Sequence, residues 1–108
     1  MPDGQTVFQQ LMQTIKDRRD HPPEKSYTNS LLAGGVSKIG GKISEEAAEV
    51  VEAAGEDGTE HFVYECADLL YHLFVMMALR DVELEQIEAE LARRFGISGI
   101  DEKASRNA

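Results

Sequence analysis

The stretch from His61 to Leu79 is the feature that most restricts what this chain can fold into. Its residues are apolar nearly all round at helical spacing, which predicts a helix that is buried on every side. Two acids, Glu65 and Asp68, nevertheless lie inside it, with His61 and His72 on the same narrow stripe. Ionised carboxylates are almost never buried without a partner. The fold must therefore neutralise these two acids.

A divalent metal ion is the partner that the composition favours. Between Ser44 and Glu90 the chain has 14 Asp and Glu residues and a single base, Arg80, so protein cations cannot neutralise the acids. Carboxylate oxygens are hard ligands that suit Mg²⁺ or Mn²⁺, and Mg²⁺ typically joins a few carboxylates to substrate phosphates. The sequence therefore predicts a Mg²⁺ site that handles phosphates.

A second group of acids lies upstream, at Glu45-Glu46 and Glu49, so the chain reads E-E-x-x-E and later E-x-x-D. Residues three or four apart lie side by side on a helix, and each half therefore presents two carboxylates from one patch of surface. Lys38 and Lys42 precede the first group on the same stripe. The helix therefore shows a patch of two lysines that leads into a patch of carboxylates.

The simpler interpretation of acids along a helix is a solvated face, and for Glu45, Glu52 and Glu56 taken alone that interpretation is preferred. It does not explain Glu65 and Asp68, because their helix offers no polar face on which to expose them. The pairing of the two acid motifs therefore favours the metal site.

Composition limits the class of protein. A chain of 108 residues with 42% hydrophobic and 29% charged residues is expected to form one globular domain over 1–108. A net charge of −9 argues against nucleic-acid binding, and the apolar stretch is too short and too charged to span a membrane. The chain opens without a secretory signal and has one cysteine, Cys66, which is expected to pack in the core. These features predict a cytoplasmic protein.

The predicted class is all-α, with four to five helices in a bundle completed by dimerisation, because no strand pattern occurs. A dimer is expected since the apolar helix is too large for its short neighbours to cover. The polar tail, 96–108, is expected to be partly mobile. Spacing, caps and breakers place the helices at 6–19, 26–34, about 37–55, 61–80 and 83–95.

The start of the first acid helix has two interpretations. Ser44 as N-cap would place Glu45 and Glu46 in a first turn and explain both acids structurally. A start near Ser37 keeps the apolar residues in phase and is preferred. Its weakness is Gly40-Gly41, since each interior glycine costs about 1 kcal/mol. Close approach by a ligand or another helix would explain that pair.

Several segments resemble the phosphoribosyl-ATP pyrophosphatase family, within the all-α nucleotide pyrophosphatase superfamily. The resemblance extends over nearly the whole chain from Ser26 onward, whereas the first helix is generic. The double acid motif alone fits the wider superfamily, while the Tyr71-His72 ending and the tail favour this family. The segments that carry the resemblance are 26–28 with 31–32, 42–50, 65–72, 96–99 and 102–106.

This resemblance implies Mg²⁺-dependent hydrolysis of phosphoribosyl-ATP to phosphoribosyl-AMP and pyrophosphate, the second step of histidine biosynthesis, by a dimer of all-α subunits. Glu45 and Glu52 are close enough to assist the metal ligands, and a spare carboxylate, for which Glu45 is the first choice, would take the proton from water. Basic residues outside the acid stripe are expected to bind the second ribose phosphate. By position, the implied metal ligands are Glu46, Glu49, Glu65 and Asp68, and the substrate-binding residues are Lys38, Lys42, Arg80, Arg93, Lys103 and Arg106.

Three alternatives remain at this point. A house-cleaning NTP pyrophosphatase would share the double acid motif. A redox di-metal bundle is disfavoured, because such bundles carry Glu-x-x-His where this chain has Glu or Asp. A non-enzymatic acidic interaction module explains the charge but not the acids inside an apolar helix.

Overall fold

The computed structural model describes residues 4–97 and 99–107, and over these residues it is all-α. This confirms the predicted class. The described helices are α1 (Val7–Asp20), α2 (Tyr27–Ala54), α3 (Glu60–Leu79), α4 (Leu84–Arg93) and α5 (Gly99–Asn107).

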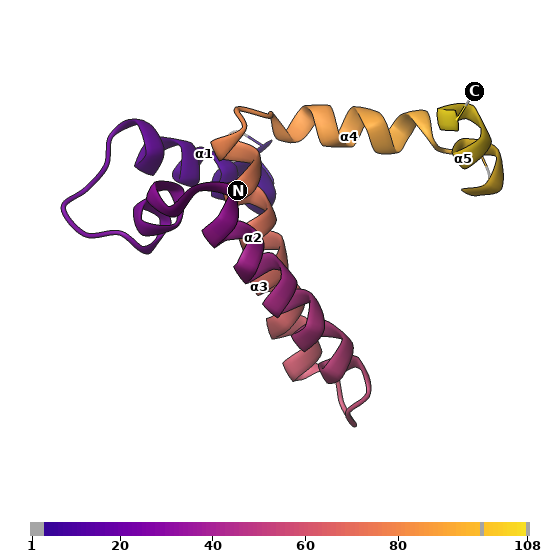
Figure 1. Ribbon diagram of the computed structural model, residues 1–108, viewed down its shortest axis with the longest axis horizontal. Helices are drawn as coiled ribbons and strands as arrows, with labels where there is room; N and C mark the ends of the chain where they lie inside the picture. Colours follow the sequence, from indigo (N-terminus) through magenta and orange to yellow (C-terminus); the bar gives the residue numbers. More distant parts are fainter. Residues whose placement is uncertain (1–3, 98, 108) are drawn as a thin grey trace.

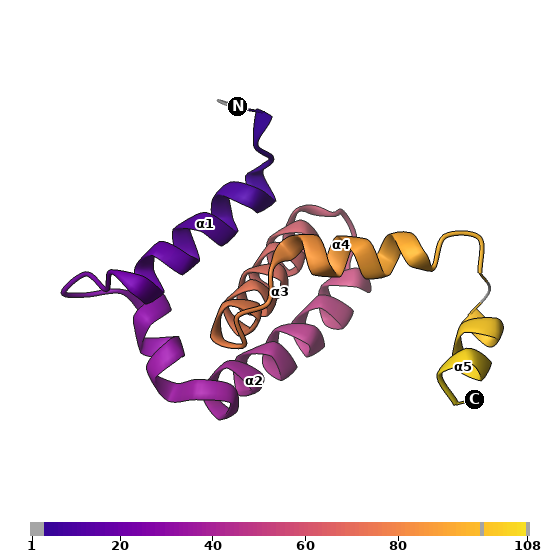
Figure 2. The same cartoon turned by 90° about the horizontal axis from the view of Figure 1, so that it is seen from above.

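Helices α2 and α3 form an antiparallel pair that is the body of the molecule (Figure 1), and α1 packs against both. The core lies where α1, the first half of α2 and the end of α3 meet. Helix α4 leaves this body at the end of α3 and carries α5 at its far end (Figures 1 and 2). We call α4 and α5 together the arm. The core residues are Met12, Ile15, Leu31, Ile39, Phe74, Val75, Ala78 and Leu84.

Local signals set the helix ends. Thr6 caps α1 in a capping box with Gln9, and the Ser26 hydroxyl accepts a hydrogen bond from the Asn29 amide at the start of α2. Gly58 has the predicted left-handed conformation, with φ 78°, in the turn between α2 and α3. Gly96, with φ 81°, follows α4.

The two helices predicted on either side of Gly34-Gly35 are joined in α2, with a sharp corner between them. Gly35 has φ 69° and ψ −161°, a combination that essentially only glycine adopts. The acid helix runs through Ser44 without a break, so the earlier of the two predicted starts is right. Neither glycine of the 40–41 pair is explained by close packing, because a Cβ on Gly41 would meet no described atom within 4 Å.

The prediction that the His61–Leu79 stretch is buried on every side is wrong for the single chain. Helix α3 packs against α2 along its length and α1 at one end, which leaves an apolar face exposed. Val63 and Tyr64 are 62% and 64% exposed. The expectation that this stretch is too short and too charged to span a membrane is wrong, because α3 is long and apolar enough to do so by length and composition. Core helices of soluble proteins pass the same test, so this is weak evidence for a membrane span.

The C-terminal region differs from the sequence prediction in two ways. Helix α4 ends at Arg93, so Phe95 lies beyond it and is 79% exposed. The tail, which was predicted without a helix, contains α5. Arg106 lies in the last turn of α5, where a cation is favourable to the helix dipole.

Candidate active site

Three of the predicted metal ligands meet between α2 and α3. Glu46 and Glu49 are one turn apart on α2 and face Glu65 on α3. One carboxylate oxygen from each lies within 4.8 Å of the others. Glu46 and Glu65 are each only 6% exposed, and Glu49 is half-buried. We call Glu46, Glu49 and Glu65 the carboxylate cluster.

Folding makes the ionised form of this cluster unfavourable. Burial, helped by the neighbouring carboxyl groups of Glu65, Glu49 and Asp68, raises the pKa of Glu46 to about 7. Contact with Glu49, followed by burial, raises the pKa of Glu65. One oxygen of Glu46 and one of Glu65, Oε2 in each case, is buried without a hydrogen-bond partner among the described residues. Acceptor oxygens in this state fit a hard cation.

The other predicted acids lie at the rim of this cluster. Asp68 is half-buried, one turn after Glu65, and its charge contributes to the raised pKa of Glu46. Glu45 is exposed, with an oxygen 3.6 Å from Lys42 Nζ. Glu52 is exposed as well. The structure thus groups Asp68 with the cluster and keeps Glu45 at its outer edge.

The two predicted lysines lie in different surroundings. Lys42 is at the rim, where the charges of Glu45 and Glu46 and the Tyr27 phenol raise its pKa. Lys38 lies back along the helix, and its Nζ donates to the Ser30 carbonyl at 3.2 Å. Its stem fills the space where a Cβ on Gly34 would lie. Only Lys42 is therefore placed beside the carboxylates.

Both histidines of the α3 stripe contact the site. His61 is exposed, and its ring nitrogens lie 2.9 Å from a Glu56 oxygen and 3.1 Å from a Glu65 oxygen. Those hydrogen bonds, the one to Glu56 first, raise the pKa of His61. His72 Nδ1 lies 2.8 Å from the backbone carbonyl of Asp68.

Two residues in the first turn of α2 are part of this network. The Tyr27 hydroxyl lies 2.9 Å from His72 Nε2, and the buried Thr28 hydroxyl bonds the Tyr71 hydroxyl. The signal available was the position of Tyr27 and Thr28 directly after the Ser26 N-cap. It could not show that this turn packs against α3.

Residues 8–95 match the family described as PRA-PH, phosphoribosyl-ATP pyrophosphohydrolase. The chain is 50% identical to a phosphoribosyl-ATP pyrophosphatase of Rhodopirellula baltica, over 100% of this chain and 92% of the relative. It is also 50% identical to one of Trichlorobacter lovleyi, over 98% of both chains, and 46% identical to one of Geobacter metallireducens, over 98% and 97%. The chain belongs to the phosphoribosyl-ATP pyrophosphohydrolase family.

The part of the chain that matches the phosphoribosyl-ATP pyrophosphohydrolase family includes both acid motifs, and the relatives extend the similarity through the tail. The family resemblance drawn from residues 26–106 is therefore confirmed. Two of the segments that carried it, 42–50 and 65–72, are brought together by the fold in the carboxylate cluster.

The remaining basic residues predicted to bind this family's substrate lie away from the cluster within one chain. Arg80 is exposed at the end of α3, and Arg93 is bonded to Glu90 on α4. Lys103 and Arg106 are on α5, at the far end of the arm (Figure 1). Their roles remain predictions.

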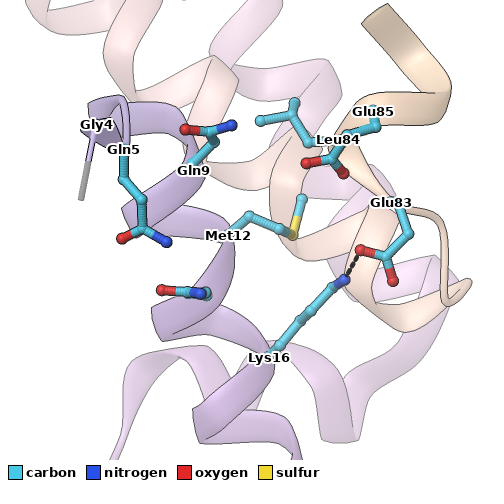
Figure 3. Close-up of a pocket in the computed structure, with 9 residues that line it drawn as sticks. Gly4, Gln5, Gln9, Met12, Lys16, Glu83, Leu84 and Glu85 are labelled. Carbon is cyan, nitrogen blue, oxygen red and sulfur yellow. Dashed lines mark hydrogen bonds and ion pairs between the residues drawn. The ribbon is translucent and has the colours of Figure 1, made fainter. Parts of the chain in front are cut away.

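A cavity of about 440 Å³ lies elsewhere, between α1 and the start of α4 (Figure 3). Lys16 and Glu83 form an ion pair across it, and the Gln9 and Met12 side chains line it. None of its lining residues belongs to the carboxylate cluster. The cavity is therefore separate from the site that this phosphoribosyl-ATP pyrophosphohydrolase family member is expected to use.

Proposed function

We propose that this chain hydrolyses phosphoribosyl-ATP to phosphoribosyl-AMP and pyrophosphate, the second step of histidine biosynthesis, with Mg²⁺ as cofactor. The observation that carries the proposal is a pair of buried oxygens, one of Glu46 and one of Glu65, that lie beside Glu49 and have no hydrogen-bond partner in the described part of the chain. Membership of the family, and relatives named phosphoribosyl-ATP pyrophosphatase, support the choice of reaction.

The residues present fit a divalent cation. Mg²⁺ would be held by Glu46, Glu49, Glu65 and Asp68. Without metal, the raised pKa of Glu46 favours its protonated form, and the charge of the metal would take the place of that proton. Bound Mg²⁺ supplies polarisation of a phosphoryl oxygen and a lowered pKa for a coordinated water. Because Glu46 and Glu65 are buried, bulk water would not compete with them for the metal.

The chain's own groups then have separable tasks. Lys42 holds phosphate oxygens of the substrate at the rim. Water attacks one phosphorus of the α–β phosphoanhydride, and the bond between that phosphorus and the bridging oxygen breaks. The products are phosphoribosyl-AMP and pyrophosphate. Glu45, exposed at the outer edge of the cluster, accepts the proton of that water. Lys38 would contribute once its Nζ leaves the Ser30 carbonyl.

We also propose that the working form is a cytoplasmic homodimer that binds a small-molecule nucleotide and neither nucleic acid nor membrane. The exposed apolar face of α3 and the extended arm support the dimer. Since the arm carries Lys103 and Arg106 away from the carboxylates of their own chain, these residues would serve the site of the second subunit. Arg80 and Arg93 are the next candidates for binding the phosphate on the second ribose.

The test is pyrophosphate release from phosphoribosyl-ATP, with and without Mg²⁺, compared with release from ATP and dCTP. We expect Mg²⁺-dependent release, with a far higher kcat/KM on phosphoribosyl-ATP, because only that substrate offers the second ribose phosphate. Preference for a canonical or damaged NTP would favour the house-cleaning alternative, which the same carboxylate cluster would serve. No release from any nucleotide would contradict the enzymatic proposal.

A further inference from the structure

Tyr27 is an exposed aromatic residue whose ring is fixed. It is the first residue of α2 and is 51% exposed. Its hydroxyl lies 2.9 Å from Nε2 of the buried His72, and its ring stacks on Tyr71 with centroids 6.2 Å apart and planes at 18°. A surface tyrosine without a role is usually free to change rotamer. This one presents a defined ring to solvent.

The hydrogen bonds of His72 define how Tyr27 is held. His72 Nδ1 lies 2.8 Å from the Asp68 carbonyl, which only accepts, so Nδ1 carries the proton. Nε2 is then the acceptor, and the Tyr27 hydroxyl donates to it. The ring is thus tied, through His72, to the turn of α3 that carries Asp68.

The ring also lies at the rim of the carboxylate cluster. Burial raises the pKa of the Tyr27 hydroxyl, the charge of Lys42 opposes this, and Glu46 and Asp68 add to it. The geometry agrees, because the Tyr27 hydroxyl contacts His72 Nε2 and His72 Nδ1 contacts the backbone carbonyl of Asp68. The Tyr27 ring therefore borders the carboxylate side of α3.

We infer that the exposed face of the Tyr27 ring stacks against the purine base of the nucleotide while Lys42 and the carboxylates engage its phosphates. The inference rests on the proposed function. The carboxylates and Lys42 recognise only phosphate and metal, so a separate group must contact the base. An aromatic face does so by stacking, and a ring already fixed by two contacts loses little conformational freedom on binding.

The alternative is that Tyr27 only supports the fold through its hydrogen bond to His72. Two variants separate the roles. Tyr27→Phe keeps the ring face and removes the hydroxyl, whereas Tyr27→Leu removes both. Stacking predicts that Phe preserves nucleotide binding, and a structural role of the hydroxyl predicts that Phe and Leu are equally damaging.

The experiment is titration calorimetry with Mg²⁺ and two probes, α,β-methylene-ATP, which has a base, and inorganic tripolyphosphate, which has none. We expect Tyr27→Leu to weaken binding of the methylene analogue roughly 5- to 100-fold, the range of base–aromatic stacking, and to leave tripolyphosphate binding unchanged. Tyr27→Phe should keep most of the affinity for both probes. With phosphoribosyl-ATP, Tyr27→Leu should raise KM more than it lowers kcat.

The inference would be overturned if Tyr27→Leu weakened the binding of both probes equally or left binding of the methylene analogue unchanged. It would also be overturned if Tyr27→Phe and Tyr27→Leu lost the same affinity, or if the unsubstituted protein did not bind the methylene analogue. Circular dichroism of each variant establishes that the fold is retained. Pyrophosphate release by the unsubstituted protein is measured separately, so failure of the proposed function is distinguishable from failure of the stacking contact.

Discussion

At the scale of single residues, folding makes the ionised forms of the Glu46 and Glu65 carboxyl groups unfavourable. Both are buried, and each keeps one oxygen without a hydrogen-bond partner among the described residues. His61 offsets part of this cost through its contact with Glu65. The unfavourable term that remains is the one a bound cation would remove.

The metal-free protein should therefore lose stability as pH rises. The pKa of Glu46 is about 7 in the folded state and 4.5 as the reference value, so the folded state binds more protons between these values and the free energy of unfolding falls as pH increases. One group contributes at most about 1.4 kcal/mol per pH unit. The raised pKa of His61 acts in the same direction, because its stabilising charge is lost as pH rises through the folded-state pKa.

Urea denaturation at pH 5 and pH 7.5 in a chelator, with and without Glu46→Gln, measures this effect. We expect the unsubstituted protein to be less stable at pH 7.5, a smaller pH dependence in the variant, and a gain at pH 7.5 on adding Mg²⁺. Stability that rises from pH 5 to 7.5 without metal would contradict the account of the cluster.

Removing one charge from the proposed metal site should abolish turnover without unfolding the protein. Glu49→Gln and Asp68→Asn remove a negative charge that a hard cation needs, while relief of like-charge repulsion offsets the lost ligand in the metal-free state. We expect kcat to fall by about 100-fold or more, as for loss of a preorganised electrostatic group. Glu60→Gln, at an exposed acid on α3, is the matched control. Full activity of either site variant at saturating Mg²⁺ would rule out the assignment.

At the scale of elements, the corner at Gly35 decides where the first turn of α2 lies. This corner places Thr28 and Leu31 against the core and Tyr27 against His72. Gly41 is different, because it lies in a regular helix with no described atom near its Cβ position. Substitution by alanine is therefore expected to change the stability of the protein in opposite directions at the two positions.

Gly35→Ala should destabilise the protein by about 1–3 kcal/mol, since φ 69° and ψ −161° exclude a Cβ. Gly41→Ala should stabilise it by up to about 1 kcal/mol through helix propensity. Denaturant unfolding of both variants measures the difference. If Gly41→Ala instead lowers stability or activity, a ligand or another subunit approaches that backbone closely, as the sequence first indicated.

At the scale of the whole molecule, the single chain is too open for its size. Its radius of gyration is 16.2 Å, against about 13 Å for a compact chain of this length. Its accessible surface is 7564 Å², against about 6000 Å² for a compact protein of this mass. The excess of roughly 1600 Å² falls in the range that one subunit of a stable homodimer buries.

We predict that the protein is an obligate dimer. Sedimentation at micromolar concentration should show no folded monomer, and the melting temperature should rise with protein concentration. Val63→Glu, on the exposed face of α3, should weaken the dimer more than Val7→Glu on α1, although the two valines are 62% and 67% exposed. A folded monomer of the unsubstituted chain at micromolar concentration would refute this prediction.

The tail should control substrate choice more than catalysis. Removing the chain after Gly99 deletes Lys103 and Arg106, the predicted readers of the second ribose phosphate. We expect the ratio of kcat/KM on phosphoribosyl-ATP to that on ATP to fall, with slow ATP cleavage less affected. Lys25→Ala, at an exposed lysine far from the tail in sequence, is the control. An unchanged ratio would contradict the predicted role of the tail, and Arg80 and Arg93 would then be the next residues to test.

The sequence by itself determined most of the helices, the cap of α1 and the pairing of two acid motifs. These features depend on residues three or four apart, such as the Thr6–Gln9 capping box or Glu46 with Glu49, and local geometry fixes them. It also indicated the family, because the motifs that carry the resemblance are contiguous segments.

Only the tertiary structure decided which side chains meet. It placed Glu46 inside the cluster and Glu45 at its edge, exposed one face of α3, and joined Tyr27 to His72 across 45 residues. Burial of a helix face depends on which other elements cover it. Adjacent acids on one helix point in different directions, and the position of the neighbouring helix decides which of them is buried. For the same reason the arm, which little else in its own chain covers, could not be placed from its sequence.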